Sequence, residues 1–171
     1  MLKLPHSERR RAYECAASHL SAIIFYGILN ISMRIAIVGS LDFTDDIKKT
    51  ADQLEAAGCE TVIPYGSRLI LSGKTTAQEI RAQGSAQKAA TDVIRYYYGE
   101  IQQSDALLVL NYTKKGIEHY VGANTFLEIG FAHVLDKKIY LLNPIPDMEY
   151  LKVELEAMKP VVLTGDLSLI K

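Results

Sequence analysis

Along residues 33–171, short apolar runs alternate with longer segments whose apolar positions recur at helical spacing. This alternation predicts an α/β fold with a parallel sheet and right-handed crossovers. The run at 34–38 suits a strand buried on both faces, and the run at 106–111 is the strongest candidate for a central strand. Five strands are expected, at residues 34–38, 61–64, 106–111, 137–143 and 161–163.

Five strands connected in this way predict a flavodoxin-like or Rossmann-like three-layer sandwich with the sheet order 2-1-3-4-5. Helices are expected between the strands. The first ends near Ala57, another covers about residues 87–103, and a third starts near Thr125. Residues 65–86 contain three glycines and show no clean periodicity, so a loop with a broken helix is expected there.

Residues 1–32 differ from the rest and are predicted to form an extension separate from a domain at 33–171. A basic start is followed by an apolar run, Ala22–Ile31, which is too short to span a bilayer. Either an added N-terminal helix or a start codon assigned too early would explain the extension, and no membrane association is expected. A chain of 171 residues is long enough for one domain with a substantial core.

Composition narrows the classes of function. The formal net charge of −1 does not favour a nucleic-acid partner, since nucleic-acid-binding domains are usually strongly basic. Cys15 and Cys59 form neither a disulfide framework nor a metal-ligand spacing, so a reducing cytoplasmic setting without a bound metal is expected. The chain has no GxGxxG or Walker motif, which leaves dinucleotide-binding and NTPase functions without support.

Ligands of such sheets bind beyond the carboxyl ends of the strands, near the point where the strand order reverses. The segments that follow the first and third strands are therefore expected to form the site. The candidate binding residues there are Gly39, Ser40, Asp42, Asn111, Tyr112, Gly122, Ala123 and Asn124. The loop at 111–120 also carries Lys114, Lys115 and Tyr120, which either contact a base, sugar or phosphate or belong to a solvated loop.

Glu128 is the candidate catalytic residue, because it lies among apolar residues in the first turns of a predicted helix. Two interpretations stay open. Thr125 and Glu128 match the capping-box pattern, in which the glutamate reaches back to the N–H of the N-cap residue. Alternatively, the small and apolar residues on its helix face would partly desolvate the carboxylate, a placement typical of acid–base or nucleophilic groups in pockets.

A larger set of residues forms a recognisable pattern over about residues 33–145. It consists of the opening MRIAIVGS, Ser104-Asp105 before a hydrophobic strand, the run Thr125-Phe126-Leu127-Glu128-Ile129-Gly130-Phe131-Ala132, and the turn Lys137-Lys138. This set resembles the nucleoside 2-deoxyribosyltransferase-like superfamily. That superfamily includes deoxyribosyltransferases and nucleoside 5′-monophosphate N-glycosidases.

The resemblance implies that Glu128 is a nucleophile that attacks C1′ of a ribose or deoxyribose and expels the base, without a cofactor. It also implies that Gly122, Ala123 and Asn124 shape the sugar or phosphate end of the pocket, and that a homodimer or higher oligomer forms. The superfamily often has two aspartates that are missing here, since Gly122 stands at one position and Tyr97 near the other. Either Tyr97 or an asparagine is expected to take over the binding role of these aspartates. The alternative is a non-catalytic nucleotide-binding module of the same fold.

Overall fold

The computed structural model describes residues 32–84 and 92–171 of the chain, and residues 33–171 form a compact unit of their own. The helix predicted for the N-terminal extension lies outside the described residues. The elements are, in chain order, β1 (Arg34–Gly39), η1 (Leu41–Phe43), α2 (Thr44–Ala56), β2 (Glu60–Val62), α3 (Tyr65–Leu71), α4 (Ala77–Ala82), α6 (Val93–Gln102), β3 (Ala106–Leu110), α7 (Ala123–Val134), β4 (Lys138–Leu141), α8 (Glu149–Ala157), β5 (Val161–Val162) and η2 (Leu167–Leu169).

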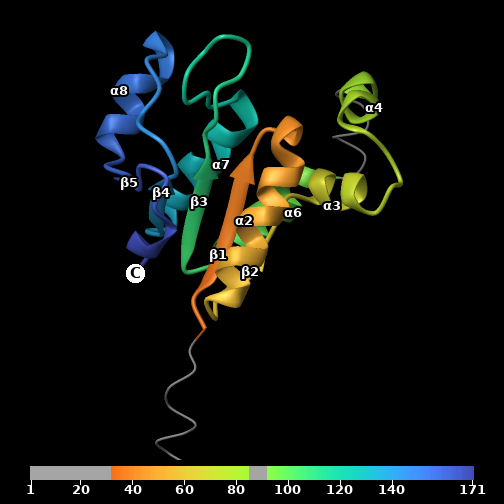
Figure 1. Cartoon of the computed structure of the whole chain (residues 1–171). Coiled ribbons are helices and arrows are strands. Elements are labelled where there is room, and N and C mark those ends of the chain that lie inside the picture. The colour runs from red at the N-terminus through yellow and green to blue at the C-terminus, as the bar shows by residue number, and fades with distance from the viewer. Residues whose placement is uncertain (1–31, 85–91) are drawn as a thin grey trace, which may run out of the picture. The chain divides into compact units, whose positions relative to one another are not determined.

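The five strands form one sheet in the order β2-β1-β3-β4-β5, and each neighbouring pair is parallel (Figure 1). This arrangement confirms the predicted fold class and strand order. The two central strands are the most apolar: every residue of β3 and the inner residues of β1 are buried. Such runs suit central strands of a parallel sheet because both of their faces are covered.

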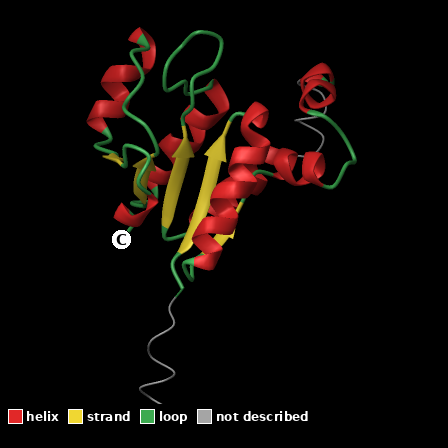
Figure 2. Cartoon of the chain, in the orientation of Figure 1, coloured by secondary structure: helices red, strands yellow, loops and turns green. Residues whose placement is uncertain are grey.

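Helices cover both faces of the sheet (Figure 2). On one face, α6, α7 and α8 pack through Tyr97, Ile129 and Leu155. On the other face, α2 packs through Ile47 and Leu54. Because successive side chains of a strand point to opposite faces, β1, β3 and β4 each contribute buried residues to both cores. The result is the three-layer sandwich that the pattern predicts.

The stretch expected to be a loop with a broken helix instead holds the two short helices α3 and α4. After α3, Gly73 has a φ of +72°, a left-handed conformation that glycine adopts easily where a helix stops. α4 begins with a capping box, in which the Thr76 hydroxyl accepts from the Glu79 N–H and the Glu79 carboxylate accepts from the Thr76 N–H. Helices this short give no readable period in the sequence.

Of the helix predicted over about residues 87–103, the structure describes α6 from Val93 onward, and residues 85–91 lie outside the described range. The start of another helix differs from expectation. α7 begins at Ala123 with Gly122 as its N-cap, so the helix starts before Thr125. This earlier start changes the position of Glu128 within the helix.

Arg34, the first residue of β1, joins several elements at the amino edge of the sheet. Its Nε donates to Glu60 at 2.7 Å and its Nη2 donates to Glu100 at 2.7 Å. Its backbone N–H donates to a carboxylate oxygen of Asp105 at 2.8 Å. β1, β2, α6 and the entry to β3 are thus held together at the edge opposite to the carboxyl ends of the strands.

Candidate functional site

The carboxyl ends of β1 and β3 lie side by side, because Gly39 is paired with Leu110 in the register of the sheet. From β1 the chain moves to β2 on one side and returns to β3 on the other, so this is where the strand order reverses. A Cβ atom on Gly39 would lie 3.2 Å from the carbonyl oxygen of Leu110. Gly39 therefore allows the two strands to approach, which is a packing role at the base of the site.

Glu128 is a buried carboxylate on α7, with 7% of its surface exposed. Because α7 starts at Ala123, Glu128 lies in the second turn of the helix, beyond reach of the N-cap N–H. The predicted capping box between Thr125 and Glu128 is therefore wrong: Thr125 is itself inside the helix and buried. Instead, Glu128 Oε1 accepts a hydrogen bond of 2.9 Å from Nδ2 of Asn124 on the preceding turn.

The first turn of α7 lies at the carboxyl edge of the sheet. Ala123 and Asn124 are exposed, and Gly122 provides no side-chain cap for the first N–H groups of the helix. The structure therefore brings together Gly122, Ala123, Asn124 and Glu128, all four of the residues that were assigned to this segment. Helix N-termini of this kind leave backbone donors that favour anions.

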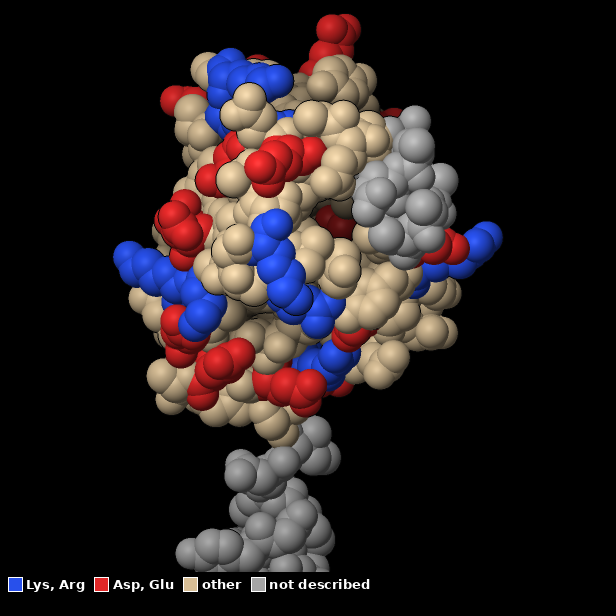
Figure 3. All heavy atoms as spheres, turned by 90° about the vertical axis from the view of Figure 1, so that its right-hand side faces the viewer, with Lys and Arg blue, Asp and Glu red and all other residues tan. Residues whose placement is uncertain are grey.

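Figure 3 views the face of the molecule that carries α3 and α4, and it shows a hollow with acidic atoms at its floor. On this side, the Arg68 guanidinium lies over the rings of Tyr65 and Tyr96, at 5.6 and 5.4 Å from their centroids. Arg68 Nη2 also donates to the hydroxyl of Tyr96 at 2.5 Å. This cluster was not predicted from the sequence, although the three consecutive tyrosines at 96–98 are a signal for it.

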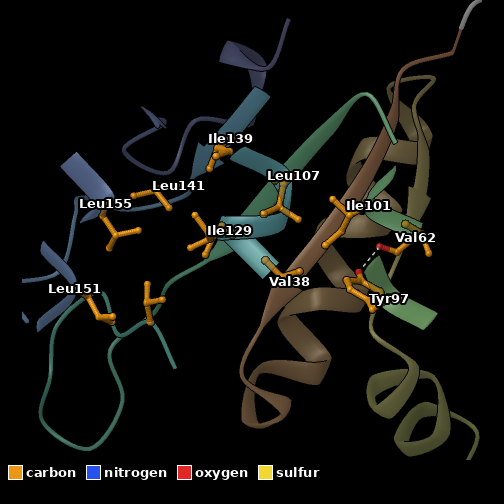
Figure 4. Packing of buried hydrophobic residues seen from close by; sticks show 14 of the residues in the cluster. Val38, Val62, Tyr97, Ile101, Leu107, Ile129, Ile139, Leu141, Leu151 and Leu155 are labelled. Carbon is orange, nitrogen blue, oxygen red and sulfur yellow. Dashed lines mark hydrogen bonds between the residues drawn. The ribbon is translucent and has the colours of Figure 1, made fainter. Parts of the chain in front are cut away.

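Tyr97 was predicted to contact a substrate, but its side chain lies in the core and is only 3% exposed (Figure 4). Its hydroxyl donates to the carbonyl oxygen of Ile37 at 2.5 Å and also lies 3.2 Å from that of Val62. Burial raises the pKa of Tyr97, and the charge of Glu128 adds to this effect. Tyr97 is therefore a core residue on the face of the sheet that α7 covers, and it is not exposed to a substrate.

Asn111 was expected to bind a ligand, but the structure gives it another role. The residue is fully buried, and its Nδ2 donates to the carbonyl oxygens of Asn143 at 3.1 Å and Pro144 at 2.9 Å. Its Oδ1 accepts from the N–H of Asn143 at 2.9 Å. The buried amide group fastens the end of β3 to the segment after β4, and it does not face the surface where a ligand would bind.

Tyr112 was also expected to contact a ligand, but its side chain lies on the face of the sheet that α2 covers. Its ring packs edge-to-face on Phe43 with centroids 5.3 Å apart. Burial raises the pKa of Tyr112, and the charge of Asp46 on α2 acts in the same direction. Because α7 covers the opposite face, Tyr112 and Glu128 are on different sides of the sheet.

Ser40 and Asp42 follow β1 and are joined to two cations. Lys114 Nζ lies 2.6 Å from Ser40 Oγ and 2.7 Å from Asp42 Oδ2, and Arg81 Nη1 lies 2.6 Å from Asp42 Oδ1. Hydrogen bonds from Lys114 and then Arg81 lower the pKa of Asp42. The two predicted residues therefore do face the edge of the sheet, and Lys114 from the loop after β3 meets them there.

No cluster of three or more His, Cys, Asp or Glu side chains suited to a metal ion occurs within residues 32–84 and 92–171. Over the same ranges, no helix has the length and apolar character needed to cross a membrane. Comparison of the chain with models of protein families, with curated proteins and with solved structures finds no match in any of the three. A functional assignment therefore has to rest on the chemistry of the site.

Proposed function

We propose that the protein cleaves or transfers the N-glycosidic bond of a nucleoside or nucleoside 5′-monophosphate, with Glu128 as the nucleophile. The observation that carries this proposal is the placement of Glu128. It is buried at the sheet edge where α/β proteins bind ligands, and it is oriented by Asn124 rather than used as a helix cap. The resemblance of residues 33–145 to the deoxyribosyltransferase-like superfamily points to the same chemistry.

In the proposed reaction, a Glu128 oxygen forms a bond to C1′ while the bond from C1′ to the base nitrogen breaks. The electron pair of that bond leaves with the base, which takes a proton from solvent. Water or a second base then attacks C1′ and gives up a proton to solvent, and the Glu128 carboxylate departs as the leaving group. Two displacements at one carbon retain its configuration, as in retaining glycosidases.

Asn124 supports this role because its amide N–H holds one carboxylate oxygen of Glu128 in a fixed orientation. Burial also favours it, since a desolvated carboxylate is a stronger nucleophile than a hydrated one.

A non-catalytic nucleotide-binding module is the second candidate. It is favoured by Gly122, which stands where the resembled superfamily often has an aspartate, and by Asp42, whose two oxygens are already bound to cations. Such a module would bind nucleotides without turnover, which ligand-induced thermal stabilisation would detect.

Free-base release from a panel of nucleosides and 5′-monophosphates, with and without a second base, tests the proposal. We expect Glu128→Gln to reduce release by roughly a thousandfold or more, as loss of a covalent nucleophile does. Glu118→Gln is the matched control, because it makes the same change at an exposed loop carboxylate. Mass spectrometry of quenched reactions would show one sugar on the peptide that contains Glu128.

The proposal fails if the wild-type protein releases no base from any substrate, or if Glu128→Gln releases base as fast as the wild type. Thermal stabilisation by nucleotides without release would favour the binding module. Dependence of release on the second base would identify a transferase, and release into water a hydrolase.

A further inference from the structure

We propose that Lys114 recognises the 5′-phosphate of a nucleoside monophosphate, and that Asp42 occupies the position of that phosphate in the ligand-free protein. This inference rests on the proposed function and narrows its substrate class from nucleosides in general to their phosphomonoesters. It follows from the contacts of Lys114, from the form of its loop, and from its link to the start of α7.

Lys114 is placed more tightly than a surface lysine. Only 18% of its side chain is exposed, and its ammonium group contacts Ser40 Oγ at 2.6 Å and Asp42 Oδ2 at 2.7 Å. The same Nζ lies 5.5 Å from the centroid of the Tyr120 ring, within the range of a cation–π contact. An ammonium group and a hydroxyl that converge on one point form a donor pair for an oxyanion.

Asp42 shows how an anion fits this position. Its two carboxylate oxygens are bound by different cations, Oδ1 by Arg81 and Oδ2 by Lys114. Two cations against one carboxylate leave the cluster with net positive charge. A phosphate presents three oxygens to such donors, and charge-assisted bonds to phosphate are among the strongest polar contacts in proteins. A phosphate can therefore displace the carboxylate and keep both cations.

The loop that carries Lys114 is held in one conformation. Lys114 and Ile117 exchange two backbone hydrogen bonds of 3.0 Å across a tight turn. The two residues between them, Lys115 and Gly116, have φ values of +52° and +76°. A turn with two positive φ values is the type that closes β-hairpins, and a left-handed lysine in it is a strained residue. The turn thus presents Lys114 in a fixed direction before any ligand binds.

Tyr120 connects this anion position to the start of α7. Its ring lies against Lys114 on one side, and a Cβ atom on Gly122 would lie 3.3 Å from its Cε1 atom. Gly122 is the N-cap of the helix that carries Glu128 in its second turn. A substrate with its phosphate at Lys114 would therefore have its sugar beside the first turn of α7, on the side where Asn124 orients Glu128.

The test compares a 2′-deoxynucleoside and its 5′-monophosphate as substrates of the wild type, Lys114→Met and Lys115→Met. We expect the wild type to prefer the monophosphate. Lys114→Met should lower kcat/KM on the monophosphate by about 10- to 100-fold more than on the nucleoside, as the loss of one charged hydrogen bond predicts. Lys115→Met removes the same charge from the exposed neighbour and should leave the preference of the enzyme within about threefold.

Outcomes that overturn this inference differ from those that overturn the proposed function. Lys114 does not recognise the phosphate if base is released but the wild type prefers the nucleoside, or if Lys114→Met still prefers the monophosphate. Either result would leave the role of Glu128 as nucleophile intact. If no base is released, calorimetric titration with the same monophosphate decides. Binding that weakens at least tenfold in Lys114→Met supports the phosphate site, and absent or unchanged binding refutes it. Lys114→Gln replaces Lys114→Met if circular dichroism shows that the latter does not fold.

Discussion

Replacement of Asn111 by alanine is expected to destabilise the protein strongly, although the residue lies at the edge where ligands bind. The side chain makes three hydrogen bonds, two to the carbonyl oxygens of Asn143 and Pro144 and one from the N–H of Asn143. All three connect the end of β3 to the segment after β4. Asn111→Ala removes them together and leaves the half-buried backbone groups of Asn143 and the exposed carbonyl group of Pro144 without their partner.

The size of the effect follows from these contacts. Each protein hydrogen bond contributes about 1 kcal/mol net, and a buried group left without a partner costs about 1–3 kcal/mol. Pro144 is exposed, so water can replace its bond, whereas the groups of Asn143 are partly buried. We therefore expect the free energy of unfolding to fall by about 3 kcal/mol. Domains of this size have about 5–15 kcal/mol of stability, so the variant should remain folded.

Urea unfolding followed by far-ultraviolet circular dichroism measures this change, with an unchanged m-value as evidence that the native state stays compact. Asn143→Ala is the control, because it removes only the bond of 3.3 Å from its own Nδ2 to the backbone oxygen of Asn111. It should cost about 1 kcal/mol or less. A loss below about 1 kcal/mol in Asn111→Ala, together with loss of nucleotide binding, would refute the structural role and restore the predicted ligand contact.

Three further outcomes are expected. Tyr97→Phe should make stability less sensitive to alkaline pH. Burial raises the pKa of Tyr97, so above about pH 10 the unfolded chain releases the phenol proton while the folded protein keeps it. The free energy of unfolding of the wild type should therefore fall by up to about 1.4 kcal/mol per pH unit in that range. Equal pH dependence of stability in the wild type and the variant, measured by urea unfolding, would contradict this. Gly122→Ala should shift Tyr120 by a few tenths of an ångström and weaken substrate turnover severalfold. Its Tm should change little, since the φ of −79° at this position suits alanine. Unchanged kinetics would count against the link between Tyr120 and the site. Thr76→Ala should cost about 1 kcal/mol of local stability, seen as faster hydrogen exchange in α4 while global unfolding stays the same.

The sheet could be predicted from the sequence because its strands are short apolar runs bounded by polar or glycine residues. Every residue at 106–110 is buried, and a short unbroken apolar run of this kind indicates a strand with both faces covered. The segment after β2 could not be predicted in the same way. α3 and α4 are each too short to show a helical period, although the spacing of Thr76 and Glu79 is a readable capping signal.

The positions of the candidate residues in the fold could be predicted from the sequence, but their contacts could not. Glu128 fits a capping box on local pattern, but α7 starts at a glycine N-cap, which leaves no side-chain signal in the sequence. Asn111 looks like a free polar residue after a strand, since its partners lie more than thirty residues further along the chain. The pairing of Lys114 with Asp42 likewise joins two distant loops, and only the three-dimensional fold reveals it.

The contacts of Arg34 hold the sheet together at a distance from the loop after β3, so that this loop can be replaced without disturbing them. They fasten β1, β2, α6 and the entry to β3 at the amino edge, far along the strands from the loop that carries Lys114. Grafts between Tyr112 and Val121 would leave that fastening untouched. Under the proposed function, substrate preference and folding could then vary separately, and this sheet would serve as a scaffold for libraries of new specificities.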